Sequence, residues 1–143
     1  MEGIGLRYLL DTAVWINGVT MPEVLPLRIR QLIGAETVKG LCGVSLLETA
    51  ILYRLGRLQF EGKLMDFFEA GLSTDLRLLD LTPMVAHKTN ELPSRFPGDP
   101  FDRTIVATAS VLDLKLITTD AAIRDAGVCA VEYYPFKAAS RRR

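Results

Sequence analysis

Four acidic residues stand where short apolar runs of this sequence meet helical patterns. Two of them end apolar runs and two lie in the first turns of helical patterns: Asp11, Asp120, Glu48 and Asp102. If these side chains converge, they offer only oxygen ligands, which suit Mg²⁺ or Mn²⁺. A hard cation bound in this way activates a water molecule and stabilises the charge that develops on a phosphoryl oxygen. The predicted chemistry is therefore hydrolysis of a phosphodiester.

Each of these acids also has a purely structural interpretation as a helix cap or as the partner of one. In PGDPFDRTIVATAS (97–110), Asp99 can be the N-cap of a helix and Asp102 can reach back to it. Ser45 and Glu48 have the spacing of a second capping box. A cap contributes about 1 kcal/mol, whereas two carboxylates ~5 Å apart repel by roughly 3 kcal/mol at an effective dielectric constant of about 20. Convergence of all four acids would therefore require a cation.

Apolar runs and helical patterns alternate along the chain, and these elements must position the acids. The expected strands cover residues 6–11, 40–44, 76–81, 114–120 and 129–134. The expected helices cover residues 22–34 (regular only from Pro26 onward), 45–58, 61–72, 83–92, 100–113 and 121–127. This order predicts an α/β fold with a mostly parallel central sheet flanked by helices. Ligands of such sheets lie outside the carboxyl ends of the strands, so we expect the four acids at one edge.

The composition is that of a soluble globular protein, with 143 residues of which 49% are hydrophobic and 24% charged. We predict one domain over residues 1–136, followed by a basic, disordered tail over residues 137–143. The 17 basic and 17 acidic residues balance, which neither supports nor excludes a nucleic-acid partner. The first residues do not resemble a signal peptide, and the apolar runs are too short to span a membrane. We therefore expect a cytoplasmic protein without membrane contact.

The cysteine and histidine content excludes several other kinds of site. Cys42 and Cys129 stand alone in apolar stretches, so we expect reduced, buried thiols. His87 is the only histidine, and its pattern places it on a helix face. A structural zinc site and a histidine-based triad are therefore both disfavoured.

Other phosphoryl-transfer enzymes also use acids at strand ends, and they form the alternative enzyme class. A receiver domain needs an acidic pair after the first strand and a lysine after a late one, and this chain has neither. A haloacid-dehalogenase-like phosphatase needs Asp-x-Asp, where this chain has Ala13 in the second acidic place. A strand-end phosphoryl-transfer enzyme is therefore the less favoured interpretation.

Four motifs follow the order and approximate spacing of the PIN-domain ribonucleases. They are YLLDTAVWI (8–16), SLLE (45–48), GDPFDRTIVATA (98–109) and LITTD (116–120). The chain most resembles a VapC-type toxin of a type II toxin–antitoxin system. The resemblance covers nearly the whole chain and implies a PIN-like three-layer fold, with the nuclease domain over residues 1–136.

The resemblance also implies which residues form the site. The catalytic, metal-binding acidic quartet of the family corresponds to Asp11, Glu48, Asp102 and Asp120. Asp99 matches a further acid, which is either an auxiliary metal ligand or only the helix cap. Thr12 and Thr118 match hydroxyl positions that flank such sites, and Arg103 matches the family's usual arginine.

The family implies a Mg²⁺- or Mn²⁺-dependent endoribonuclease that hydrolyses RNA phosphodiesters and forms a homodimer. It also implies a small cognate antitoxin, which in this family often places a basic side chain in the acidic pocket. The early helices that line antitoxin grooves contain Trp15, Leu27, Ile29 and Leu32, although core packing is the favoured interpretation for most of them. The non-enzymatic alternative is a catalytically inactive PIN-like interaction module, and the presence of all four acids argues against it.

Overall fold

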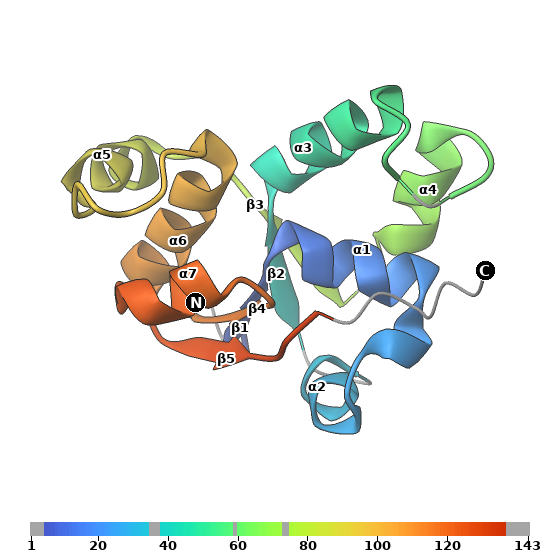
Figure 1. The fold of residues 1–143 in the computed structure, drawn as a ribbon, viewed down its shortest axis with the longest axis horizontal. Helices are drawn as coiled ribbons and strands as arrows, with labels where there is room; N and C mark the ends of the chain where they lie inside the picture. The colour runs from blue at the N-terminus through green and yellow to red at the C-terminus, as the bar shows by residue number, and fades with distance from the viewer. Residues whose placement is uncertain (1–4, 35–37, 59, 73–74, 137–143) are drawn as a thin grey trace.

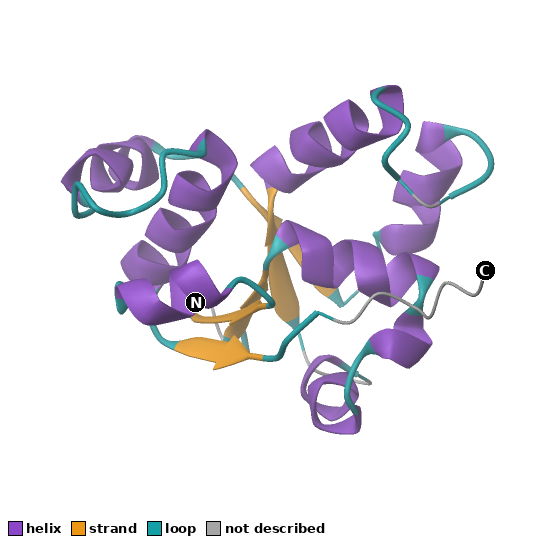
Figure 2. Ribbon diagram, in the orientation of Figure 1, coloured by secondary structure: helices purple, strands orange, loops and turns teal. Residues whose placement is uncertain are grey.

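The centre of the molecule is a five-stranded sheet in the order β3-β2-β1-β4-β5, in which every neighbouring pair is parallel (Figures 1 and 2). A computed structural model describes residues 5–34, 38–58, 60–72 and 75–136. The strands are β1 (Tyr8–Leu10), β2 (Lys39–Cys42), β3 (Leu76–Leu79), β4 (Lys115–Thr118) and β5 (Val131–Tyr133). The predicted α/β fold is confirmed, and the described sheet is parallel throughout. The predicted tail over residues 137–143 lies outside the described residues.

The helices confirm most of the predicted pattern. They are α1 (Thr12–Thr20), α2 (Leu27–Ile33), α3 (Gly43–Arg54), α4 (Leu64–Gly71), α5 (Pro83–Glu91), α6 (Pro100–Leu112) and α7 (Ala121–Ala126), with a 3-10 turn η1 (Pro22–Val24) before α2. Leu25 is extended and α2 begins only after Pro26, because proline disfavours a helical conformation of the residue before it. The expected helices did not include α1, which follows Asp11 directly and has nine residues.

Both faces of the sheet are buried, because successive strand side chains point to opposite sides. On one side, Leu9 of β1 packs with Ile105 of α6 and Ile123 of α7. On the other side, Leu10 packs with Trp15 of α1 and Phe67 of α4. Figure 1 shows the same division, with α5, α6 and α7 on one side of the sheet and α1, α2 and α4 on the other. The result is the predicted three-layer arrangement.

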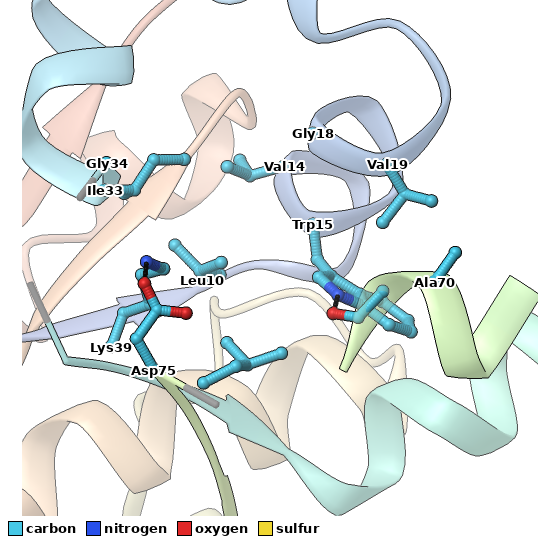
Figure 3. Close-up of a pocket in the computed structure, with 12 residues that line it drawn as sticks. Leu10, Val14, Trp15, Gly18, Val19, Ile33, Gly34, Lys39, Ala70 and Asp75 are labelled. Atoms are coloured by element: carbon cyan, nitrogen blue, oxygen red, sulfur yellow. Dashed lines mark hydrogen bonds and ion pairs between the residues drawn. The ribbon is translucent and has the colours of Figure 1, made fainter. Parts of the chain in front are cut away.

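Trp15 fixes α4 against α1 beside a cavity of about 470 Å³ (Figure 3). Its Nε1 donates a hydrogen bond of 2.9 Å to the carbonyl oxygen of Gly71, and a Cβ on Gly71 would lie 2.8 Å from the indole ring. At the edge of the cavity, Lys39 Nζ lies 2.7 Å from Asp75 Oδ2. No member of the predicted acidic quartet lines this cavity, so it is separate from the expected site.

Several further predictions can be compared with the structure. Trp15 and Ile29 are core residues, whereas Leu27 is 63% exposed. Cys42 is buried, Cys129 is half-buried, and both are free thiols. His87 is exposed on α5, where its Nε2 lies 3.2 Å from Glu91. Within the described ranges, no helix has the length and apolar character needed to cross a membrane.

Candidate active site

Asp11 lies directly after the central strand β1, where it is the N-cap of α1. Its carboxylate accepts hydrogen bonds from the backbone N–H of Thr12 (2.9 Å) and from the hydroxyl of Thr118 (2.6 Å). Burial raises the pKa of Asp11, and these two hydrogen bonds counteract the shift. The Thr118 oxygen also accepts from the backbone N–H of Asp120 (3.0 Å). One hydroxyl therefore joins the ends of β1 and β4.

Asp99 and Asp102 stand at the start of α6 and have different surroundings. Asp99 is the N-cap, and its carboxylate accepts from the backbone N–H groups of Phe101 (2.8 Å) and Asp102 (3.4 Å). Burial raises the pKa of Asp102 to about 7, and the charges of Asp11, Asp99, Asp120 and Glu48 add to this increase. The capping role of Asp99 is therefore confirmed. Asp102 instead lies within the electrostatic reach of all the other acids.

Glu48 does not have the capping role that its spacing suggested. The helix α3 begins at Gly43 with Cys42 as its N-cap and without a side-chain cap, so the predicted Ser45–Glu48 capping box is wrong. The strand β2 passes directly into the helix, which places Ser45 inside the first turn. Ser45 is fully buried, and its hydroxyl lies 2.7 Å from that of Thr12.

The carboxyl group of Glu48 lies within the electrostatic reach of Asp11 and Asp99. Its pKa is raised by burial and by the charges of Asp11 and Asp99, while the Thr12 hydroxyl opposes the shift. Its Oε1 atom is buried without a hydrogen-bond partner in the described part of the chain. Glu48 therefore has an unused oxygen beside a group of negative charges.

Asp120 completes the group at the end of β4. It is the N-cap of α7, where its carboxylate accepts from the backbone N–H of Ala122 (2.8 Å). Its charge raises the pKa of both Asp11 and Asp102. We name the five residues Asp11, Glu48, Asp99, Asp102 and Asp120 the acidic cluster. Each of these acids therefore interacts electrostatically with at least one other, and the assignment of a site to this edge of the sheet stays a prediction.

The acidic cluster suits a hard cation by its chemistry, although it is not a preformed ligand set. Within the described residues, no group of three or more His, Cys, Asp or Glu side chains is arranged to hold a metal ion. The carboxylates instead repel one another, and this repulsion adds to the effect of burial on the raised pKa of Asp102. A cation would compensate this charge and would satisfy the unpartnered oxygen of Glu48.

Arg103 follows Asp102 in the sequence, but its described hydrogen bonds go to backbone carbonyl oxygens and not to the carboxylates. Its guanidinium donates to the carbonyl oxygens of Phe96 (3.3 Å), Pro97 (3.2 Å) and Thr89 (3.0 Å). These bonds connect the end of α5 to the segment that leads into Asp99. Arg103 is therefore placed as a positioning residue for the start of α6.

We expect Arg103→Ala to lower the free energy of unfolding by about 2–3 kcal/mol, because three carbonyl groups lose a charged donor. Urea unfolding monitored by circular dichroism measures this loss. Arg95→Ala is the matched control, since Arg95 is exposed and makes a single described bond of 3.3 Å to the carbonyl of Ala126. Equal free energies of unfolding for the two variants would contradict the role of Arg103 as a positioning residue for the start of α6.

Ser45 and Asn17 lie near the site and are not among the predicted site residues. The spacing predicts a cap at Ser45, but the burial of a serine that stands one helical turn before Glu48 indicates a contact with the neighbouring helix. Asn17 is buried in the middle of α1, and its side chain forms a hydrogen bond with that of Tyr134. The sequence signal for Asn17 is weak, because it is a single amide in an otherwise apolar helix.

Comparisons with known proteins identify the family and the fold. The model of the PIN domain family matches residues 8–128. The chain is 33% identical over 116 residues to Ribonuclease VapC22 of Mycobacterium tuberculosis. The aligned region covers 81% of this chain and 88% of that protein. The fold resembles a DNA-bound VapBC structure from Salmonella typhimurium (TM-score 0.69, 20% identity, 90% of this chain and 98% of that one). It also resembles FitAcB from Neisseria gonorrhoeae (TM-score 0.63, 24% identity, 87% and 96%). The family match and the extent of the identity show that the chain belongs to the PIN-domain family.

Proposed function

We propose that this protein is a divalent-metal-dependent endoribonuclease and the toxin of a toxin–antitoxin pair. The observation that supports it most is the convergence of the acidic cluster at the carboxyl edge of the sheet. Burial raises the pKa of Asp102 to about 7 with the help of the charges of the four other acids, and such a cluster is unfavourable unless a cation is bound. The identity to a protein named as a ribonuclease supplies the substrate class.

In this proposal Asp11, Glu48, Asp102 and Asp120 bind Mg²⁺ or Mn²⁺, with Asp99 as an auxiliary acid. The cation would supply an activated water molecule and would stabilise charge on the phosphoryl oxygens. Thr12 and Thr118 keep Asp11 in place by the hydrogen bonds to its carboxylate. Asp102, whose pKa is about 7, would lose its proton when the cation binds. Arg103 keeps the α6 start in position.

We expect cleavage products with a 5′-phosphate and a 3′-hydroxyl. In the proposed site the cation would activate a water molecule, and the single histidine, His87, lies on the exposed face of α5 beside Glu91. A water molecule is therefore the expected nucleophile. Incubation of the purified chain with RNA and Mn²⁺, followed by analysis of the product ends, tests this prediction. Cyclic 2′,3′-phosphate ends, or full activity in excess EDTA, would contradict the proposed mechanism, and intact RNA would favour an inactive interaction module.

The proposed protein partner is a small antitoxin. The support comes from two solved structures of similar fold. One is the DNA-bound VapBC from Salmonella typhimurium, and the other is a toxin–antitoxin complex from Klebsiella pneumoniae. A homodimer belongs to the same proposal, and Leu47 and Leu55 provide exposed apolar side chains on and just after α3. We place the activity in the cytoplasm, where the RNA substrate is found.

A further inference from the structure

A groove of about 380 Å³ begins at the acidic cluster and is lined by residues of the neighbouring helices α1 and α3 (Figure 1). Glu48 of α3 lines it, and so do Thr12 at the start of α1 and Thr20 at its end. Because Thr12 and Thr20 are eight positions apart and an α-helix rises about 1.5 Å per residue, the groove follows α1 for about 12 Å. It therefore extends well beyond the carboxylates.

The walls of this groove are mostly apolar. Ile16 of α1 and Leu52 of α3 line it, each one helical turn after a residue of the candidate site. Phe136, which follows β5, also lines the groove and is 47% exposed. An aromatic ring that is exposed in this way offers a flat apolar surface on which a nucleobase can stack. The groove therefore has the lining that a base beside the acidic cluster would require.

Arg57 gives the groove a positive charge at the end of α3. Its backbone N–H donates to the carbonyl oxygen of Leu52 (2.8 Å), and that of Gly56 donates to Tyr53 (3.0 Å). These two bonds form a Schellman motif, in which Gly56 takes the left-handed conformation with φ of 74°. The motif ends the helix and fixes the backbone of Arg57 beside the groove.

The side chain of Arg57 is available to a ligand. It lines the groove and is exposed. Among the residues that the structure describes, none forms a hydrogen bond or an ion pair with its guanidinium. A guanidinium suits a phosphate group because its planar set of donors matches two phosphate oxygens at once.

The order of charges along the groove matches a nucleic-acid strand. With the proposed cation bound, the acidic cluster attracts one phosphate, and Arg57 attracts another on the far side of the apolar walls. A basic peptide would be attracted by the carboxylates but repelled by Arg57. The charges therefore favour a nucleotide as the occupant.

We propose that the groove between α1 and α3 is an RNA subsite, in which a base next to the cleaved phosphodiester stacks on Phe136 and Arg57 binds the phosphate beyond that base. This inference rests on the proposed metal-dependent function, because it places the cleaved bond at the acidic cluster. Arg57 and Phe136 set the affinity for RNA and take no part in the activation of water.

The first test compares cleavage of a short single-stranded RNA pool of random sequence by full-length proteins in Mn²⁺. Arg57→Gln should raise KM about tenfold, because one charged contact to phosphate is lost. Its kcat should stay close to that of the native protein. The matched control is Arg54→Gln, which removes the same charge from an exposed residue of α3 that does not line the groove. The control should keep the native KM.

A second measurement needs no cleavage. Fluorescence anisotropy of the same RNA pool, labelled with fluorescein, gives its dissociation constant in EDTA at several salt concentrations. Loss of one phosphate contact should lower the slope of log affinity against log salt concentration by about 0.7 in Arg57→Gln. Arg54→Gln should keep the native slope.

Phe136 is tested by two substitutions in the same binding assay. Phe136→Leu keeps an apolar side chain but removes the aromatic face, so it should weaken RNA binding about fivefold. Phe136→Tyr keeps the ring and should bind RNA as the native protein does. Native binding by Phe136→Leu, or an equal loss in both variants, would overturn the stacking of a base on this residue.

The remaining outcomes decide the role of Arg57. Equal changes in Arg57→Gln and Arg54→Gln would overturn the subsite, because bulk charge would then be the cause. A lower kcat at unchanged KM would also overturn it. Native RNA binding by Arg57→Gln, together with tighter binding of a labelled oligoarginine peptide, would assign the groove to a basic peptide instead. Absence of cleavage by the native protein would contradict the proposed function, and the anisotropy measurements would then decide whether the groove binds RNA.

Discussion

Asp102→Asn is expected to reduce RNA cleavage at least 100-fold while the protein remains folded. The substitution keeps the size and helical position of the side chain but removes one charge from the proposed metal site. Loss of several kcal/mol of transition-state stabilisation corresponds to a decrease of about 100-fold or more. Asp66→Asn is the matched control, because Asp66 occupies the corresponding first-turn position of α4 and is exposed. Cleavage that survives in Asp102→Asn would remove this residue from the proposed mechanism.

The same substitution should stabilise the metal-free protein at neutral and higher pH. The folded-state pKa of Asp102 is about 7, above its ordinary value of 3.8, so ionisation of this group destabilises the fold. The cost is fully present above pH 7 and disappears as the pH falls through 7 toward 4. After allowance for partial solvent exposure, we expect about 1–2 kcal/mol. Urea unfolding in EDTA should show this pH dependence in the native protein and a weaker one in Asp102→Asn. An unchanged profile would argue against the crowding of acids.

Millimolar Mn²⁺ is expected to raise the melting temperature of the metal-free protein by about 10 °C. Binding to the folded state alone contributes about 2.7 kcal/mol at a hundredfold excess over the dissociation constant, and a chain of this size gains roughly 3–4 °C per kcal/mol. Asp11→Asn should abolish the gain, because Asp11 is the most buried acid of the cluster and is fixed by Thr118.

Differential scanning calorimetry with and without EDTA measures this effect. Asp66→Asn, which changes a carboxylate outside the acidic cluster, should retain the full shift. A native protein that melts at the same temperature in EDTA and in millimolar Mn²⁺ would contradict a metal site. A shift that persists in Asp11→Asn would place the metal elsewhere on the protein.

The sheet could be predicted because its strands are continuous apolar runs, which is the pattern of strands buried on both faces. The helix α1 was harder to predict, because Val14, Ile16 and Val19 are β-branched and have low helix propensity. Its stability comes from tertiary contacts such as the burial of Val14 and Trp15, as is usual for helices in proteins. Local preference therefore underestimated an element that long-range packing maintains.

The positions of the acids relative to the strands could be predicted, but the contacts that hold them could not. Parallel strands bring their carboxyl ends to one edge, so position in the pattern was sufficient for Asp11 and Asp120. The role of Ser45 depends on the exact residue at which β2 becomes α3, and a pattern does not determine such a boundary. Two partners of Arg103 are backbone carbonyl groups of an irregular segment. The side-chain types in that segment do not indicate where its carbonyl groups lie.

The hydrogen bond between Asp11 and Thr118 joins residues that are 107 positions apart in the chain. Protein synthesis proceeds from the N-terminus, so β1 leaves the ribosome long before its neighbour β4 exists. Until β4 is added, Asp11 lacks the hydroxyl that fixes its carboxylate, and the cluster lacks Asp120. For the proposed nuclease, completion of the acidic cluster would therefore follow the synthesis of β4, so that activity toward RNA would begin only after most of the chain has been made.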